Sequence, residues 1–352
     1  MARRVLRAAL PSITDVATVA GVSVATVSRY FNAPDRVKNQ TRERIAAAVA
    51  KLGYVPHARR RLDSRSSGTV GLIVPTIDSA IFSEMIQEFS TTLFSYARTT
   101  IIAAHGYDLD LEAILVESLL GQNIDAIAIV GTKHSKQTLR LLERADIPVV
   151  VTWSYWPQLP WPSIGVDNVE AGRKAMEHLL NLGHRDILLL VTETQANDRT
   201  TDRQQGALAA LAAHSVQVPA HRSLICPYDI QRSKELLIGA LSKKPQPSAV
   251  FAINDVIAQG ALFGAAALGL QIPNDLSIVG IGDFRGSSAM EPGMTTVRIP
   301  ARRIGVRAAE AIVAMLDTPG RTIDHSREFE LELNLRGSTA PRAKVAVNGG
   351  RD

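Results

Sequence analysis

The stretch that most constrains this chain is residues 13–32, whose sequence predicts two short helices joined by a tight turn. Gly21 can adopt the left-handed conformation that ends a helix. Ser23 follows at the position of an N-cap for the second helix, which is too short to be stable alone. The apolar residues expected to pack the two helices together are Val16, Ala17, Ala20, Val22, Val27 and Phe31.

The opposite face of the second helix carries small side chains and one arginine, namely Val24, Ala25, Ser28 and Arg29. A short helix of this kind suits the major groove of DNA. The alternative is an ordinary helical hairpin, which does not require this spacing or the arginines around it.

The positive charge of the chain is concentrated beside this helix. Residues 1–68 contain 13 Lys/Arg and 4 Asp/Glu, a net charge of +9, whereas the whole chain of 352 residues carries +5. Such a concentration is expected where a protein contacts DNA phosphates. A solvated basic face is the simpler alternative.

Five segments resemble the DNA-binding headpiece of the LacI-type family of bacterial transcription regulators: 13–17 (ITDVA), 20–23 (AGVS), 26–29 (TVSR), 41–45 (TRERI) and 52–56 (LGYVP). The resemblance implies a helix-turn-helix domain over residues 1–56, with double-stranded operator DNA as its partner. Val24, Ala25 and Arg29 are then the expected contacts to base edges. The other expected DNA contacts are Thr14, Ser23, Thr26, Ser28, Asn32 and Arg36.

Residues 57–69 are expected to form a hinge linker. In the LacI-type family this segment becomes helical on the operator and wedges a leucine into the minor groove, which can kink DNA. Leu62 is the corresponding leucine. The segment between Pro56 and Leu62 is one residue shorter than usual, and Arg60 replaces the usual alanine. Insertion of Leu62 and a linker without insertion therefore both remain open.

From residue 70 onward, short β-branched runs alternate with helical stretches. The predicted strands are 70–74, 99–104, 124–130, 147–152, 186–191, 223–226, 248–253 and 277–282. The predicted helices lie near 82–96, 109–121, 135–145, 168–182, 202–214, 231–243, 255–268 and 302–316. This alternation predicts an α/β fold with parallel sheets flanked by helices. Eight units divide into two doubly wound lobes, which leave a crevice at the carboxyl ends of their strands.

The family resemblance continues through segments such as 165–168 (GVDN), 249–255 (AVFAIND) and 295–297 (TTV). It implies a periplasmic-binding-protein-like core of two lobes, followed by a tail. The expected extents are 70–338 for the core, about 70–166 with 299–325 for lobe 1, about 167–298 with 326–338 for lobe 2, and 339–352 for the tail.

Several polar residues of the core match positions that bind the effector in this family. Arg203 corresponds to an arginine that grips effector oxygens, a task suited to its fork of donors. Asn254 and Asp255 match a pair at a strand end, and Asp283 follows the last predicted strand. Gly282 stands where the family often has an aspartate, which weakens the transfer of a known sugar-binding pattern. Each polar residue could instead be a helix cap or part of an ion pair.

Aromatic and basic residues in neighbouring loops add to this candidate effector site. Trp153 directly follows a predicted strand, where its ring could stack on a sugar or belong to a packed loop. Phe82 and His105 are further candidates, and the loops around residues 105 and 133 resemble the gluconate-repressor branch of the family. Lys133 and His134, together with Arg203, could then hold the carboxylate of a sugar acid.

Other features exclude several classes of protein. Cys226 is the single cysteine and cannot form an internal disulfide, which fits a reducing cytoplasm. No apolar run could span a membrane, and Arg7 and Pro11 interrupt any apolar core of an export signal. The core has no Gly-x-Gly-x-x-Gly after its first strand, no phosphate loop and no spaced metal ligands. We therefore expect no enzyme, cofactor or metal.

These observations predict a homodimeric, cytoplasmic transcriptional repressor whose operator affinity is controlled by a small sugar or sugar acid. The alternatives are a sugar-binding sensor or activator without repressor action, an enzyme, and a transport receptor.

Overall fold

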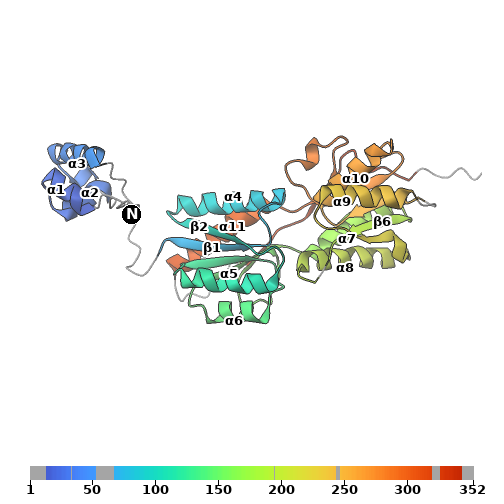
Figure 1. Cartoon of the computed structure of the whole chain (residues 1–352), viewed down its shortest axis with the longest axis horizontal. Helices are drawn as coiled ribbons and strands as arrows, with labels where there is room; N and C mark the ends of the chain where they lie inside the picture. Colours follow the sequence, from blue (N-terminus) through green and yellow to red (C-terminus); the bar gives the residue numbers. More distant parts are fainter. Residues whose placement is uncertain are drawn as a thin grey trace, which may run out of the picture. The chain divides into compact units, whose positions relative to one another are not determined.

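The computed structural model of this protein describes residues 13–32, 34–52, 67–193, 195–242, 246–318 and 326–342. The chain divides into two compact units, Met1–Ser64 and Arg65–Asp352, and each is described by itself (Figure 1). Leu62 and most of the expected linker and tail lie outside the described residues.

The described part of the first unit consists of three helices, α1 (Ile13–Ala20), α2 (Val24–Asn32) and α3 (Asn39–Leu52), with a 3-10 turn at Pro34–Arg36. Its buried core is formed by Val16, Ala17, Ala20, Val27, Ile45 and Ala48. Val22 and Phe31 pack partly buried against this core. The apolar residues that were expected to pack α1 against α2 therefore lie in or against one core.

The turn between α1 and α2 has the predicted geometry. Gly21 has a φ of +61°, and Ser23 Oγ accepts a hydrogen bond of 3.2 Å from the backbone N–H of Thr26. Arg44 of α3 donates through Nη2 to the carbonyl oxygens of Ala20 at 2.6 Å and Gly21 at 3.1 Å. The guanidinium thus satisfies carbonyls at the end of α1 and ties α3 to the turn.

The second unit begins with lobe 1, a parallel sheet with the strand order β11-β5-β4-β3-β1-β2. Its strands are β1 (Thr69–Val74), β2 (Thr99–Ala104), β3 (Ala126–Val130), β4 (Val149–Ser154), β5 (Ser163–Val166) and β11 (Arg327–Glu328). Its helices are α4 (Ala80–Ser95), α5 (Leu109–Gly121), α6 (Lys136–Arg144) and α11 (Ala301–Asp317). Figure 1 shows α4 and α11 on one face of the sheet and α5 and α6 on the other.

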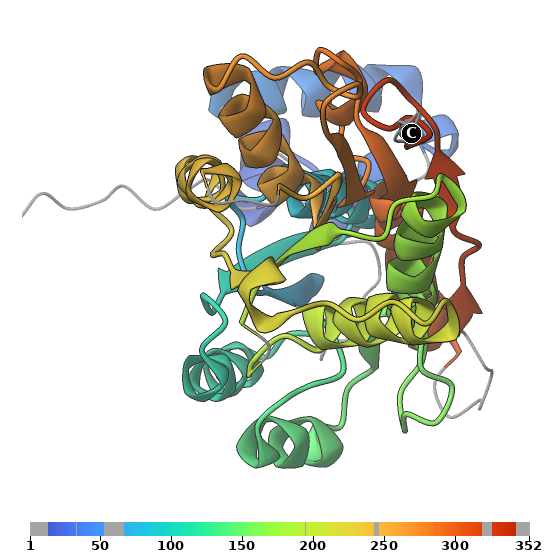
Figure 2. The same cartoon turned by 90° about the vertical axis from the view of Figure 1, so that its right-hand side faces the viewer.

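Lobe 2 repeats this arrangement, with the strand order β12-β10-β9-β8-β6-β7. Its strands are β6 (Ile187–Val191), β7 (Ser223–Ile225), β8 (Ala249–Ala252), β9 (Ser277–Gly282), β10 (Thr295–Arg298) and β12 (Glu332–Asn334), of which β12 pairs antiparallel with β10. Its helices are α7 (Asn168–Asn181), α8 (Asp198–Ala213), α9 (Ile230–Leu241) and α10 (Asp255–Ala267). Helices α7 and α8 pack together, as do α9 and α10 on the other face (Figures 1 and 2).

The predicted fold class is confirmed, and every strand and helix predicted in the core is present. Strands β5, β10, β11 and β12 were not predicted, because runs of two to four residues carry too little periodicity to be recognised. Helix α8 begins at Asp198 rather than near residue 202. The cause is Asn197, whose side chain caps the helix by accepting from the backbone N–H of Thr200 at 3.3 Å.

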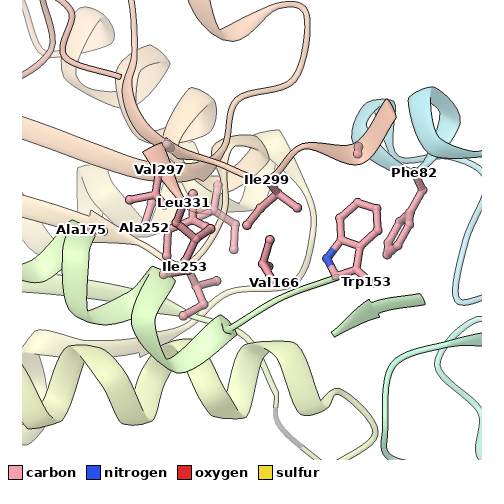
Figure 3. Close-up of a cluster of buried hydrophobic side chains, with 14 of the residues drawn as sticks. Phe82, Trp153, Val166, Ala175, Ala252, Ile253, Val297, Ile299 and Leu331 are labelled. Carbon is pink, nitrogen blue, oxygen red and sulfur yellow. The ribbon is translucent and has the colours of Figure 1, made fainter. Parts of the chain in front are cut away.

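The chain passes between the lobes three times, after β5, after β10 and after β11. The third passage follows Glu328, later than the expected boundary at residue 325. Each passage places at least one buried apolar residue in a cluster shared by both lobes, and these residues include Val166, Ile299 and Leu331 (Figure 3).

The start of the expected tail belongs to lobe 2. Ala340 O lies 3.0 Å from Nε2 of His184, and the backbone N–H of Arg342 donates to Leu182 O at 2.8 Å. Residues 339–342 therefore belong to lobe 2 rather than to the expected tail. In the described parts of the chain, no helix combines the length and apolarity needed to cross a membrane.

Helices α7 and α8 touch through their backbones. A Cβ atom on Gly172 would collide with the carbonyl of Arg203, and one on Gly206 would collide with the carbonyl of Val169. Glycine at both positions therefore permits a close approach that any side chain would prevent.

We predict that Gly206→Ala lowers the free energy of unfolding by about 1–3 kcal/mol, because the added methyl group must push two helix backbones apart. Gly239→Ala in α9 is the matched control, since its Cβ would meet open space and alanine favours a helix by up to about 1 kcal/mol. Urea unfolding of both variants should give changes of opposite sign. Equal stability of the two variants would show that the close approach does not matter.

Candidate functional site

The first unit presents the predicted DNA-contact residues on and around α2. Val24, Ala25 and Arg29 are exposed, whereas Thr26 and Ser28 are partly buried. The side chain of Ser23 is used as the N-cap and lies 2.8 Å from Thr26 Oγ1. Of the remaining predicted contacts, Thr14 and Arg36 are exposed, and the side chain of Asn32 lies outside the described residues.

The second unit contains a cavity of about 260 Å³ between the two lobes. Segments that follow the carboxyl ends of strands in both sheets line it, as expected for doubly wound lobes. The residues that line it include Phe82, Tyr107, Trp153, Arg199, Arg203, Tyr228, Asn254 and Asp255.

Two aromatic rings form an apolar wall of the cavity. The ring centroids of Phe82 and Trp153 lie 4.4 Å apart, with 42° between the ring planes (Figure 3). Trp153 has a left-handed backbone, with a φ of +78°, and its side chain is 2% exposed. Such a conformation is unfavourable for a bulky residue and is often found at ligand sites. Both rings are among the predicted effector contacts.

Arg203 is a buried positive charge of the cavity, with 6% of its surface exposed. Its Nε donates to Oδ1 of Asn168 at 3.0 Å, and its Nη1 donates to the carbonyl of Ile253 at 3.2 Å. Both of these partners are neutral, and burial lowers the pKa of Arg203. The charge of this guanidinium therefore favours an anionic or hydroxyl-rich ligand.

Asn254 has a double role. Its Oδ1 caps α10 by accepting from the backbone N–H of Ile257 at 2.9 Å. Its Nδ2 lines the cavity, is buried, and has no hydrogen-bond partner among the described residues. An unsatisfied buried donor at this position is a candidate ligand contact.

Asp255 also borders the cavity, but its carboxylate is occupied by protein donors. Thr296 Oγ1 and Ser287 Oγ each donate at 2.6 Å, and the backbone N–H of Asp283 donates at 2.7 Å. Burial raises the pKa of Asp255. We conclude that Asp255 joins the ends of β8, β9 and β10 and has little capacity left for a ligand.

Four predicted effector contacts do not line the cavity. His134 turns inward, with Nδ1 3.1 Å from the buried carboxylate of Glu112 and Nε2 2.9 Å from Gly131 O. His105 is buried with Nε2 3.7 Å from the same carboxylate. Lys133 is exposed. Asp283 forms ion pairs of 2.8 Å with Arg298 and 2.6 Å with Arg336 instead.

The cavity also contains residues that the sequence analysis did not single out. Arg199 forms a 2.6 Å ion pair with Asp198 and hydrogen-bonds Tyr107 of the other lobe. Tyr107 stacks on Tyr228, with ring centroids 5.6 Å apart and planes 11° from parallel. Arg199 lies four residues before Arg203 in α8, so helical spacing could have indicated that both occupy one face.

Asp198 connects the two lobes directly. Its Oδ2 accepts hydrogen bonds from the backbone N–H of Thr132 at 2.7 Å, from Thr132 Oγ1 at 3.0 Å and from Ser154 Oγ at 3.0 Å. Asp198 belongs to lobe 2, whereas both donors belong to lobe 1. This carboxylate therefore holds the lobes together beside the cavity.

Comparisons with known proteins agree with this architecture. Residues 12–57 match the family described as "Bacterial regulatory proteins, lacI family", and residues 176–339 match the "Periplasmic binding protein-like domain". The chain is 32% identical over 312 residues to the HTH-type transcriptional regulator GntR of Escherichia coli (strain K12), which covers 87% of this chain and 92% of that protein. It is 29% identical over 331 residues to the HTH-type transcriptional repressor CytR of the same strain, which covers 93% of this chain and 96% of that protein.

A solved structure is similar in fold over most of the chain. It is the lac repressor dimer bound to operator and the anti-inducer ONPF, with a TM-score of 0.80 at 23% sequence identity, covering 94% of this chain and 99% of that chain.

We predict that Asp202→Asn stabilises the protein more at pH 7.5 than at pH 5. Burial, followed by the charges of Asp198 and Asp167, raises the pKa of Asp202 from 3.8 to about 6. At pH values between 3.8 and about 6, the Asp202 carboxyl binds more protons in the folded state than in the unfolded state. The free energy of unfolding of the wild type therefore falls as the pH rises through this range. With allowance for solvent screening, the gain at pH 7.5 should be about 1 kcal/mol. Thermal unfolding at both pH values measures it, and an equal gain at pH 5 would contradict the assignment.

Proposed function

This chain belongs to the lacI family of DNA-binding transcriptional regulators, and we propose that it is a cytoplasmic repressor whose operator affinity is controlled by a small sugar acid such as gluconate. Its relatives are transcriptional regulators rather than enzymes, and CytR is named as a repressor. The helix α2 would read the operator, and the cavity between the lobes would bind the effector.

The exposed face of α2 supports the proposed reading of DNA. Val24 and Ala25 are small enough to approach base edges, and Arg29 can form paired hydrogen bonds to guanine. The hydroxyl groups of Thr26 and Ser28, with Arg36, would contact phosphates, which position the helix without reading sequence.

We expect Arg29→Ala to weaken binding to the selected operator by about 1–3 kcal/mol, because a paired contact to a base is lost. Binding to a random duplex of the same length should change much less. Fluorescence anisotropy with a duplex selected by the wild-type chain measures both affinities. Equal weakening on the two duplexes would reassign Arg29 to a phosphate.

The charge of the cavity supports a sugar acid. The observation that carries this proposal is the buried guanidinium of Arg203, whose two protein partners are neutral. A carboxylate would balance its charge. The free amide donor of Asn254 would bind a hydroxyl group, and the Phe82–Trp153 wall would cover the carbon chain.

Calorimetry should show that gluconate binds more tightly than glucose. Arg203→Met should weaken gluconate binding by about tenfold to a hundredfold, because a hydrogen bond to a charged group contributes about 1.5–3 kcal/mol. Arg232→Met is the control, since Arg232 is exposed on α9 and pairs with Glu235. Tighter binding of glucose would remove the acid site from the proposal.

Exposed apolar side chains support a homodimer, in which two α2 helices would address a two-fold operator. The edge strands β2 and β7 carry the exposed Ile102 and Ile225, and Phe94 near β2 is 78% exposed. Uncovered apolar edge strands favour association. Sedimentation equilibrium of the full chain should therefore report two chains, and a monomer at micromolar concentration would contradict the dimer.

A further inference from the structure

The described part of the second unit begins with two residues that are held by one carboxylate. Asp125, which precedes β3, accepts hydrogen bonds from the backbone N–H of Ser67 at 2.7 Å and from that of Gly68 at 2.8 Å. It also accepts from Ser67 Oγ at 3.1 Å. Because both backbone donors point at one buried side chain, the path of the chain into β1 is fixed before the strand begins.

Arg98 completes this arrangement, which we call the Asp125 clamp (Ser67, Gly68, Arg98 and Asp125). Its Nη1 donates to Asp125 Oδ2 at 3.1 Å, and both residues are 9% exposed. The backbone adds two further links, from Thr99 N–H to Gly68 O at 2.8 Å and from Asp125 N–H to Thr69 O at 2.7 Å. The start of β1 is therefore held from β2 and from β3.

Lobe 2 contains a similar pair of an aspartate and an arginine, but that pair does not hold the segment that leads into the linker. Asp186 precedes β6 and Arg222 precedes β7, and Arg222 donates to Asp186 through Nε at 2.9 Å and Nη2 at 3.0 Å. In each pair the arginine lies at the amino end of the edge strand, β2 in lobe 1 and β7 in lobe 2. Only the Asp125 clamp holds the segment that continues covalently into the linker and the first unit.

We propose that Asp125 is a positioning residue for operator recognition, because it fixes the point at which each linker leaves the core. This proposal rests on the proposed function, since it requires two helix-turn-helix units on one operator. Release of Ser67 and Gly68 would add roughly 7 Å of free chain to each linker. This added length exceeds the rise of one base pair, roughly 3.4 Å. A protein without the clamp should therefore bind operators with different distances between their half-sites with similar affinity.

The experiment compares full-length Asp125→Asn with full-length Asp186→Asn. Asparagine keeps the shape of aspartate but presents an N–H₂ group where the clamp needs an acceptor. Three duplexes are used as probes: a duplex selected by the wild-type chain from a random library, the same duplex with one base pair inserted between its half-sites, and a single half-site.

We expect the wild type and Asp186→Asn to bind the lengthened duplex at least about tenfold more weakly than the selected one. For Asp125→Asn the same ratio should fall below about threefold, while all three proteins bind the single half-site equally well. This pattern differs from a general loss of stability, which would affect the half-site as well.

Spacing discrimination by Asp125→Asn equal to that of Asp186→Asn would overturn the proposal. Should Asp125→Asn fail to fold, Ser67→Ala decides, because it removes one donor and leaves the buried Arg98–Asp125 pair intact. It should discriminate spacing at least about twofold less than the wild type, and an unchanged ratio would overturn the clamp. A wild-type chain that selects no duplex would instead overturn the proposed function itself.

Discussion

The three passages of the chain between the lobes are the constraint on which the rest of the second unit depends. Val166, Ile299 and Leu331 each lie on one passage and are buried in one apolar cluster shared by both lobes (Figure 3). Moving the lobes apart as separate bodies would expose this cluster to water, at a cost that grows with the apolar area. Bending about the passages leaves it buried, so hinge closure is the motion that the structure favours.

The cavity lies on the side where such bending acts. Asp198 of lobe 2 holds Thr132 and Ser154 of lobe 1 there, and Tyr107 stacks on Tyr228 across the same gap. These contacts are polar or aromatic and can be exchanged for contacts with water or with a ligand. The apolar cluster thus keeps the lobes joined. The polar and aromatic contacts beside the cavity allow the separation of the lobes to vary there.

Much of this architecture could be predicted from the sequence. The alternation of apolar runs predicted the strands and helices of both lobes, and residues at or just after the carboxyl ends of strands, such as Trp153 and Asn254, line the cavity. The direction of a side chain could not be predicted, since it depends on partners distant in sequence. His134 faces Glu112, 22 residues away, and Asp283 faces Arg336. Tyr228 enters the cavity for the same reason and was missed.

The glycine contact between α7 and α8 connects Arg203, the proposed effector contact, to the first passage. Arg203 reaches from α8 to Asn168, the first residue of α7, which begins just after Val166. Gly172 and Gly206 let the two helix backbones touch. No deformable side chains therefore separate the two helices at this point. If a bound effector displaces Arg203, we therefore expect α8 and α7 to move together and to transmit most of this displacement to the first passage.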